Sequence, residues 1–388
     1  MPDFQAAGRI AGLPPYLFAE IDRIKNEVRA KGMDIISLGI GDPDLPTPDF
    51  IVQALAEAAR KPENHRYPSY VGLLEFRQAV AAWYKERFGV RVDPGAEVIG
   101  LIGSKEGIAH FPLAFVDPGD LVLVCTPNYP VYHVAVNFAG GEVKFVPLLE
   151  ENDFLPDLEA IPDATWEKAK MIFLNYPNNP TAATASRAFF ERLVAMARAF
   201  NVIVVHDAPY TEIYFDDANK PLSILEIPGA KDVAIEFHSL SKTFNMTGWR
   251  IGMALGNKTL VQGLGKVKEN IDSGIFQAVQ EAGIAALEKG EPHARKFRAI
   301  YKERRDAVIR ALTKAGIQCR VPEASFYIWA KTPDGFTSER FVTELLQKTG
   351  VVVTPGNGFG SPGQGYFRIS LTVDTGRLEE AVSRIAKL

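Results

Sequence analysis

The sequence predicts an α/β fold, with a mainly parallel sheet between helices in a large domain and a smaller α+β domain beside it. Most of seven short runs are nearly all apolar, which is typical of strands covered on both faces. These runs are VIGLI (98–102), LVLVC (121–125), VKFVP (143–147), MIFLN (171–175), VIVVH (202–206), VAIEF (233–237) and IGMAL (251–255). Apolar residues at helical spacing lie between several of them, as in 186–200. Alternation of strands and helices favours a parallel sheet.

The end of the chain follows a different pattern. The amphipathic stretch 293–316 predicts a connecting helix. After it, the sequence predicts the strand SFYIWA (325–330), a helix over 339–350, the strands VVVTP and YFRISL (366–371), and a terminal helix. We therefore expect a small domain over 286–388.

The first 47 residues precede the large block and contain a strand of their own, IISLGI (35–40). We expect residues 1–47 to form an N-terminal arm and part of the small domain, and residues 48–285 to form the large domain. The arm contains LPPYLF (13–18), whose apolar side chains would be exposed if it were free. This favours packing of the arm on a second subunit.

The composition excludes several classes of protein. The chain has 43 Lys and Arg against 47 Asp and Glu, a net charge of −4, which disfavours a nucleic-acid or anionic-membrane binder. No secretory signal and no apolar run of about 18 residues is present, so we expect a cytoplasmic protein with no membrane span. Cys125 and Cys319 lie in apolar runs and are expected to be reduced thiols.

Polar residues follow four of the predicted strands. Ser104 and Lys105 open a helix after the first run, NYPNNPT (175–181) begins at the end of another, Asp207 ends a third, and HSLSK (238–242) follows the sixth. Ligands of parallel sheets gather at the carboxyl ends of the strands. We therefore expect these four segments to converge on one site.

The chemistry of these residues fits one cofactor. Ser104 at a helix start, Ser239, Ser241 and the guanidinium of Arg250 are groups that bind phosphate. Asp207 supplies an acid, and Lys242 supplies an amine beside the phosphate groups. A lysine, an acid or a turn alone is usually structural or solvated, but a phosphate site, a carboxylate and a reactive amine together are what pyridoxal 5′-phosphate requires.

Over essentially its whole length the chain resembles the fold-type I, pyridoxal-phosphate-dependent aminotransferases of classes I and II. The segment SLSKTFNMTGWRIG (239–252) is similar to that family's Schiff-base segment. The resemblance implies that Lys242 forms the aldimine with the cofactor, with Ser239 and Arg250 on the phosphate. Asp207 would pair with the pyridinium nitrogen.

The same resemblance implies further contacts to the cofactor. Tyr210 and Asn179 would hydrogen-bond the 3-hydroxyl group of the ring, and Tyr129 would stack on the ring face. Ser104 and the amide of Lys105 would take the phosphate from the other side.

Other residues are implied to lie at the substrate or in a second subunit. Tyr67 matches a tyrosine that reaches the phosphate of the neighbouring subunit, so we expect a homodimer with shared active sites. Arg368 matches the arginine that binds the substrate α-carboxylate, and Gly41 matches the loop whose backbone closes over it. Tyr70 and Lys105 are hypothetical donors for the far end of the substrate, because they lie beside Tyr67 and Ser104.

The prediction of the substrate depends on four short sequence motifs. The family commonly has glycine after NPT, whereas Ala182 and Ala183 follow here. NNPTAATA, GSKEGIAHFPLAF, IDSGIFQAVQEAG and VVTPGNGFG are most similar to the LL-diaminopimelate aminotransferases. That resemblance implies transfer of an amino group between LL-2,6-diaminopimelate and 2-oxoglutarate in lysine biosynthesis, by a ping-pong mechanism.

Three alternatives remain open at this point. An aminotransferase for alanine, aspartate, aromatic residues or methionine, and a C–S β-lyase, would use the same lysine. A non-catalytic regulator with an aminotransferase-like body would carry a DNA-binding module, for which the chain has no spare domain. Release of an oxo acid, with the cofactor converted to its pyridoxamine form, would mark a transaminase. Pyruvate and ammonia formed without a second acceptor would mark a lyase.

Two further motifs are set aside. GFGSPG (358–363) fits a dinucleotide fingerprint but is followed by a strand rather than a helix. The six histidines include no pair at the spacing of metal ligands, so we predict no metal site.

Overall fold

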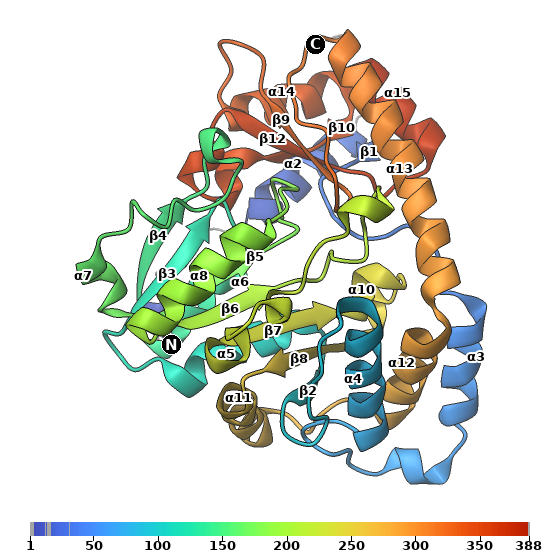
Figure 1. The fold of residues 1–388 in the computed structure, drawn as a ribbon. Coiled ribbons are helices and arrows are strands. Elements are labelled where there is room, and N and C mark those ends of the chain that lie inside the picture. The colour runs from blue at the N-terminus through green and yellow to red at the C-terminus, as the bar shows by residue number, and fades with distance from the viewer. Residues whose placement is uncertain (1–3, 12, 14–16, 31, 387–388) are drawn as a thin grey trace.

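The computed structural model describes residues 4–11, 13, 17–30 and 32–386. Its main sheet has seven strands in the order β2-β8-β7-β6-β5-β3-β4 (Figure 1). Strand β8 is antiparallel to β2 and β7, and the other neighbouring pairs are parallel. All seven predicted strands are confirmed: β2 (Val98–Leu101), β3 (Leu121–Thr126), β4 (Glu142–Pro147), β5 (Ala169–Asn175), β6 (Ile203–Asp207), β7 (Ala234–Ser239) and β8 (Gly252–Gly256).

Helices cover both faces of this sheet because successive side chains of a buried strand point to opposite faces. On β3, Val122 and Val124 pack in one hydrophobic cluster, with α5 (Ser104–Phe115), α6 (Val131–Ala139) and α11 (Lys258–Ile271). Leu123 and Cys125 pack in the opposite cluster, with α4 (Leu74–Phe88), α8 (Arg187–Phe200) and α12 (Gln277–Lys289). Helix α3 (Asp49–Ala58) packs on α12.

Strand β4 differs from the other six. It lies at the edge of the sheet and pairs only with β3 within that sheet. Val146 is its one buried residue, whereas Phe145 is 51% exposed. The apolar run VKFVP therefore belongs to a largely exposed edge strand, and not to one covered on both faces.

The smaller α+β part contains two further sheets and three helices. One sheet is antiparallel, in the order β11 (Thr354–Pro355), β12 (Tyr366–Ser370) and β9 (Tyr327–Lys331). In the other, β1 (Ile36–Ser37) pairs in parallel with β10 (Val351–Val352). The helices are α13 (Glu291–Lys314), which runs from α12 up to these sheets in Figure 1, α14 (Ser338–Thr349) and α15 (Thr375–Ile385).

Ile36 and Leu38 lie in the same hydrophobic cluster as the side chains of β9, β12 and α15. The segment around β1 therefore packs with the C-terminal strands and helix in one core. The expected domain limits at 47/48 and 285/286 stay a prediction.

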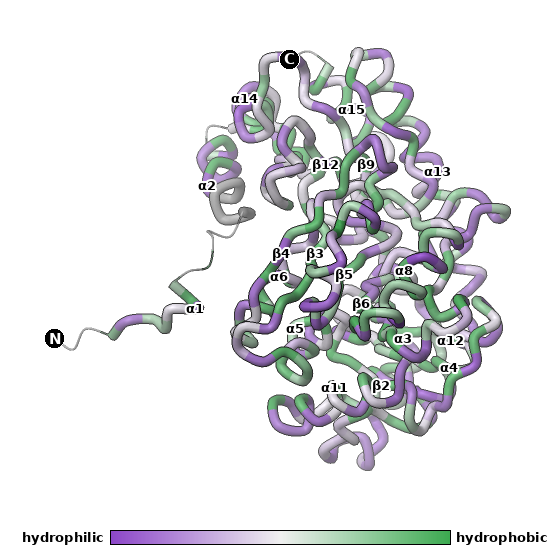
Figure 2. The backbone as a smooth tube through the Cα atoms, turned by 60° about the vertical axis from the view of Figure 1, so that its left-hand side comes forward, coloured by the Kyte–Doolittle hydropathy of each residue, from purple (hydrophilic) through white to green (hydrophobic). Residues whose placement is uncertain are grey.

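Five further α-helices lie in the described residues. Helix α2 (Leu17–Ala30) has 14 residues, and the others are single turns: α1 (Gly8–Ala11), α7 (Asp163–Trp166), α9 (Ala230–Val233) and α10 (Leu240–Thr243). Figure 2 shows α1 apart from the rest of the molecule, and none of its residues is buried. Pro14 and Pro15 of the expected arm lie outside the described residues. Packing of the arm on a second subunit therefore stays a prediction.

Candidate active site

The carboxyl ends of three neighbouring strands supply the centre of the site. Asn175 ends β5, Asp207 ends β6 directly beside it, and Ser239 ends β7. Ser239 also caps α10, because its hydroxyl oxygen accepts a hydrogen bond from the amide of Ser241 at 3.2 Å. This cap turns the chain sharply, so that Lys242 follows within one helical turn.

These residues line one cavity of about 360 Å³. Twelve of the fourteen residues singled out in the sequence contribute to its wall, although they come from positions between 41 and 368 of the chain. They are Gly41, Ser104, Lys105, Tyr129, Asn179, Asp207, Tyr210, Ser239, Ser241, Lys242, Arg250 and Arg368. The predicted convergence of distant segments is therefore observed.

The two remaining residues lie outside this wall. Tyr67 is 89% exposed and Tyr70 is 45% exposed in the single chain. Their predicted roles would require them to approach the cavity of another copy, and both roles stay predictions.

Lys242 is a buried amine with a single hydrogen-bond acceptor. Its Nζ donates to the carbonyl oxygen of Gly41 at 2.8 Å and lies 5.7 Å from the ring centre of Phe326. Burial lowers the pKa of Lys242 to about 8, helped by Arg250 and opposed by the carboxylate of Asp42. A substantial fraction of this amine is therefore neutral, and able to act as a nucleophile or base, at near-neutral pH.

Asp207 is a buried carboxyl group with one oxygen unpaired. Oδ2 accepts a hydrogen bond from the hydroxyl of Tyr132 at 2.7 Å, while Oδ1 has no partner within the described residues. Burial raises the pKa of Asp207 to about 7, and the Tyr132 hydrogen bond and His206 oppose this rise. Such a group needs a cationic or donor partner from outside the chain to complete its hydrogen bonding.

Arg368 is a buried cation that makes no ion pair within the described part of the chain. Nη1 donates to Oδ1 of Asn179 and Nη2 to the carbonyl of Gly39, both at 2.6 Å. Its guanidinium lies over the rings of Tyr327 and Phe359, at 4.3 and 4.7 Å from the centroids. Burial lowers the pKa of Arg368, which means that the cation lacks a neutralising charge. An anionic ligand group would supply one.

A second set of donors lines the same cavity. Ser104 is the first residue of α5, where free amide groups and the helix dipole favour an anion. Arg250 has φ of 54° and donates from Nη1 to the carbonyl of Thr247 at 2.8 Å. A Cβ atom on Gly103 would lie 2.3 Å from Nη2 of Arg250, so only glycine allows this close approach. Serine hydroxyls, amides and a guanidinium form the donor set that a phosphate group requires.

Sequence reasoning missed three residues of this site. Tyr132 holds Asp207, Asn175 donates from Nδ2 to the carbonyl of Asp207 at 2.7 Å, and the hydroxyl of Tyr327 lies 3.2 Å from that of Tyr210. Tyr132 follows Tyr129 by three residues, and this spacing was the available signal for a second inward tyrosine. Asn175 opens the segment NYPNNPT, which was expected at the site, but no role was assigned to it. Tyr327 carries no comparable signal.

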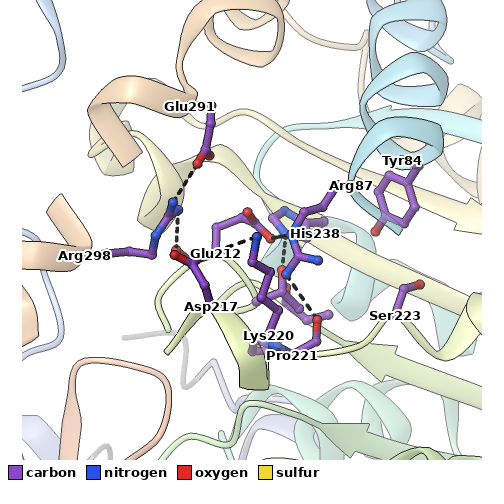
Figure 3. A network of polar contacts seen from close by, with 12 residues as sticks. Tyr84, Arg87, Glu212, Asp217, Lys220, Pro221, Ser223, His238, Glu291 and Arg298 are labelled. Carbon is purple, nitrogen blue, oxygen red and sulfur yellow. Dashed lines mark hydrogen bonds and ion pairs between the residues drawn. The ribbon is translucent and has the colours of Figure 1, made fainter. Parts of the chain in front are cut away.

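A buried ionic network supports the segment that follows β6 (Figure 3). Glu212 accepts a hydrogen bond from Nε of Arg87 on α4 at 2.9 Å, and Arg298 on α13 lies 3.4 Å from the carbonyl of Glu212. Burial raises the pKa of Glu212, while Arg87 and Arg298 favour its charged form. This network fixes the chain two residues beyond Tyr210.

One cluster among the described residues has the spacing of a metal site: Glu106, His110 and Asp272. Nζ of the fully buried Lys268 lies 3.0 Å from oxygens of both carboxylates, so an ammonium group already pairs with both of them. The prediction of no metal stays a prediction. No helix of the described residues is both long and apolar enough to cross a membrane.

The fold and the site define a class of enzyme. The family described as aminotransferase class I and II matches residues 33–385, and the chain belongs to this family. An LL-diaminopimelate aminotransferase from Nitratidesulfovibrio vulgaris is 71% identical over 389 residues, with 100% of each chain covered.

Solved proteins with different names share this fold. The substrate-bound structure of BacF from Bacillus subtilis is 40% identical, with a TM-score of 0.95, over 99% of this chain and 98% of that one. A probable N-succinyldiaminopimelate aminotransferase from Thermus thermophilus is 37% identical, with a TM-score of 0.91, over 96% and 99% of the two chains. The fold therefore does not decide which amino acid this chain uses.

Proposed function

We propose that this protein is an LL-diaminopimelate aminotransferase, which moves an amino group between LL-2,6-diaminopimelate or tetrahydrodipicolinate and glutamate or 2-oxoglutarate. The observation that carries this proposal is the 71% identity to an LL-diaminopimelate aminotransferase across both whole chains. The site agrees with it, because a buried arginine without a carboxylate partner among the described residues lines the same cavity as an acid and an amine.

The residues present fit pyridoxal phosphate as the cofactor. Ser104, Ser239 and Arg250 would hold its phosphate, and the unpaired Oδ1 of Asp207 would accept a hydrogen bond from its ring nitrogen. Tyr129 would cover the ring face, and Tyr210 would donate to the ring hydroxyl. When bound, the cofactor supplies an electron sink that stabilises negative charge at the reacting carbon of the substrate.

Ser241, Lys105 and Asn179 complete the predicted cofactor contacts. Ser241 lies in the turn capped by Ser239, and the amide of Lys105 belongs to the first turn of α5. Asn179 would serve the cofactor and the substrate together, since its side-chain oxygen already accepts from Arg368.

Lys242 has the position and the protonation state for proton transfer. Its amine faces the same cavity as Asp207, and its lowered pKa leaves part of it neutral near pH 8. We expect Lys242 to hold the cofactor and then to move a proton to and from the substrate Cα. Asp207, in its charged form, would keep the ring nitrogen protonated.

Arg368 would bind the α-carboxylate of both substrates, one after the other. Its Nε has no partner among the described residues and is available as a donor. One site that serves two substrates in turn implies ping-pong kinetics. The backbone at Gly41 would close over the bound carboxylate. Lys105 lines the cavity and would reach the far carboxylate, while Tyr70 would act there only from another copy of the chain.

The expected assembly is a homodimer with shared sites. Tyr67 is almost fully exposed, as a residue that serves another subunit would be in a single chain. Small amino and oxo acids are the expected partners, and neither nucleic acid nor a membrane is expected. Cytoplasmic location belongs to the same proposal.

A panel of amino donors tests the proposal. Purified protein with pyridoxal phosphate and 2-oxoglutarate is given LL-diaminopimelate, alanine, aspartate, methionine or aromatic amino acids, and glutamate formation is measured. We expect the highest kcat/KM with LL-diaminopimelate. Faster reaction of another donor would contradict the substrate, and pyruvate and ammonia formed from a C–S substrate without an acceptor would indicate a lyase.

A further inference from the structure

Residues 39–47 run across the cavity as a strap without regular secondary structure. The carbonyl oxygen of Gly39 accepts the hydrogen bond from Nη2 of Arg368 at 2.6 Å. Two residues on, the carbonyl of Gly41 accepts the hydrogen bond from Nζ of Lys242 at 2.8 Å. The same short backbone segment therefore contacts both buried cations of the site.

The positions of main-chain carbonyl oxygens depend on the path of the backbone, because no side-chain rotamer can adjust them. The strap lacks the repeated hydrogen bonds that fix a helix or a strand. Something outside the strap must therefore hold it if Gly39 and Gly41 are to keep their distances to the two cations.

The strongest such contact comes from helix α13. Nη1 and Nη2 of Arg304 donate to the two carboxylate oxygens of Asp44, at 2.7 and 2.8 Å. The side chain of Arg304 is 4% exposed, and that of Asp44 is 26% exposed. A bidentate pair of this kind fixes orientation as well as distance, and partial burial strengthens it.

Arg304 also reaches the strand that carries Arg368. Its Nη1 donates to the carbonyl of Leu371 at 2.9 Å, and Leu371 lies three residues beyond Arg368. One guanidinium therefore ties the strap and the end of β12 to the same point of α13. The strap's other anchors are single hydrogen bonds of hydroxyl groups: Thr354 to the carbonyl of Gly39 at 2.7 Å, Thr372 to the carbonyl of Ile40 at 3.0 Å, and Thr47 to the carbonyl of Asn245 at 2.7 Å. Among the described residues, the pair of Arg304 with Asp44 is the one bidentate contact to the strap.

We propose that Arg304 is a positioning residue for the substrate carboxylate. Through Asp44 and Leu371 it holds the strap and β12 in the relative positions in which Arg368 can bind that carboxylate. This inference rests on the proposed function. Arg304 does not line the cavity itself, so its effect would pass through the orientation of Arg368.

The direct test uses glutarate, an unreactive dicarboxylate with the carbon skeleton of 2-oxoglutarate, titrated into the cofactor-loaded protein by calorimetry. Arg304→Lys keeps the charge but loses the bidentate geometry, and Asp44→Asn removes the partner. We expect each variant to bind glutarate roughly tenfold or more weakly, since displacements of about 1 Å in a positioned site have effects of this size. Both variants alter a largely buried pair and should melt at a lower temperature, so binding is measured well below the melting temperature of each variant, where each is folded.

Arg305→Lys is the matched control. Arg305 is the next residue of the same helix, but it pairs with Asp306 and donates to the carbonyl of Pro322. We expect this variant to bind glutarate as the unaltered protein does. The double variant Asp44→Asn/Arg304→Lys should be no weaker than the weaker single variant, because both changes break one unit.

Unchanged glutarate affinity in Arg304→Lys and Asp44→Asn would overturn the inference. So would losses that multiply in the double variant, or an equal loss in Arg305→Lys. Failure of the proposed function gives a different result: the unaltered protein would bind glutarate but would not transfer the amino group of LL-diaminopimelate.

Discussion

Burial lowers the pKa of Lys242 from its ordinary value of 10.5 to about 8. The amine is therefore protonated below pH 8 and neutral above it, and only the neutral form attacks a carbonyl. We expect the rate at which cofactor-free protein captures pyridoxal phosphate to rise about tenfold per pH unit below pH 8 and to level off above it. Stopped-flow absorbance of the cofactor measures this rate.

Two variants give the controls for this prediction. Lys242→Ala should not develop the visible absorption of the bound cofactor at any pH, and its turnover should fall by roughly 10²–10⁴-fold or more. Lys105→Ala removes the other lysine of the cavity and should keep the same pH profile. A capture rate that still rises tenfold per unit up to pH 10 would show that the Lys242 pKa is not lowered.

The second prediction at the scale of residues concerns the carboxylate of Asp207. Asp207→Asn is nearly isosteric, and its side-chain oxygen can still accept the hydrogen bond from Tyr132. It loses the negative charge that would keep the ring nitrogen of the cofactor protonated. We expect kcat to fall by roughly 10²–10³-fold, as when a preorganised electrostatic group is removed, while the melting temperature stays close to the original. A kcat within twofold of the unaltered protein would contradict the role of Asp207.

At the scale of elements, periodicity and caps predicted much of the fold. The helix expected over 186–200 is α8, which begins at Arg187 because the Ser186 hydroxyl caps it. The single strand expected at VVVTP is instead two, β10 and β11. Val351 pairs with Ile36, whereas Thr354 pairs with Arg368 of another sheet. A local pattern contains no information about partners about 300 residues away.

The network around Lys268 was also beyond sequence reasoning, because it joins α11 to α5 across 162 residues. Glu106 accepts hydrogen bonds from Lys268 and from the amide of Ile102 at 3.0 Å, so it anchors the turn that leads to Ser104. Lys268→Met would leave both Glu106 and Asp272 without their cation. We expect a loss of about 3–5 kcal/mol in the free energy of unfolding, the cost typical of breaking a buried pair.

Lys266→Met is the control for that variant. Lys266 lies on the same helix, but its side chain is 78% exposed and pairs only with Glu269 at 3.3 Å. Its loss should change the free energy of unfolding by less than about 1 kcal/mol. Urea denaturation of both variants gives the comparison, and equal losses would contradict a structural role for the buried network.

At the scale of the whole molecule, the homodimer stays a prediction. Ile271 is 53% exposed and Phe276 is 45% exposed, and the loop between them contacts the segment of Tyr67, because Gly274 packs against Ser69. Apolar side chains exposed singly are ordinary on a protein surface, so these two are compatible with a monomer or a dimer. The sequence predicted the dimer through resemblance and through the apolar LPPYLF segment of the arm, since periodicity carries no signal for association.

Hybrid dimers test whether the sites are shared. Lys242→Ala and Tyr67→Ala proteins are unfolded and refolded together, and activity is compared with that of each parent. In a hybrid, one site would combine Lys242 of one subunit with Tyr67 of the other. We expect activity well above both parents, approaching one unaltered site per hybrid dimer. A mixture no more active than the mean of its parents, or a monomer in sedimentation, would contradict the shared site.

A nitrogen balance tests the central claim most directly. Stoichiometric LL-diaminopimelate is added to cofactor-loaded protein without an acceptor, ammonia is measured, and 2-oxoglutarate is then added. The account predicts no ammonia in the first step, one equivalent of amino group kept by the protein, and one equivalent of glutamate in the second step. Release of ammonia before the acceptor is added, or no glutamate after it, would contradict amino transfer at this site.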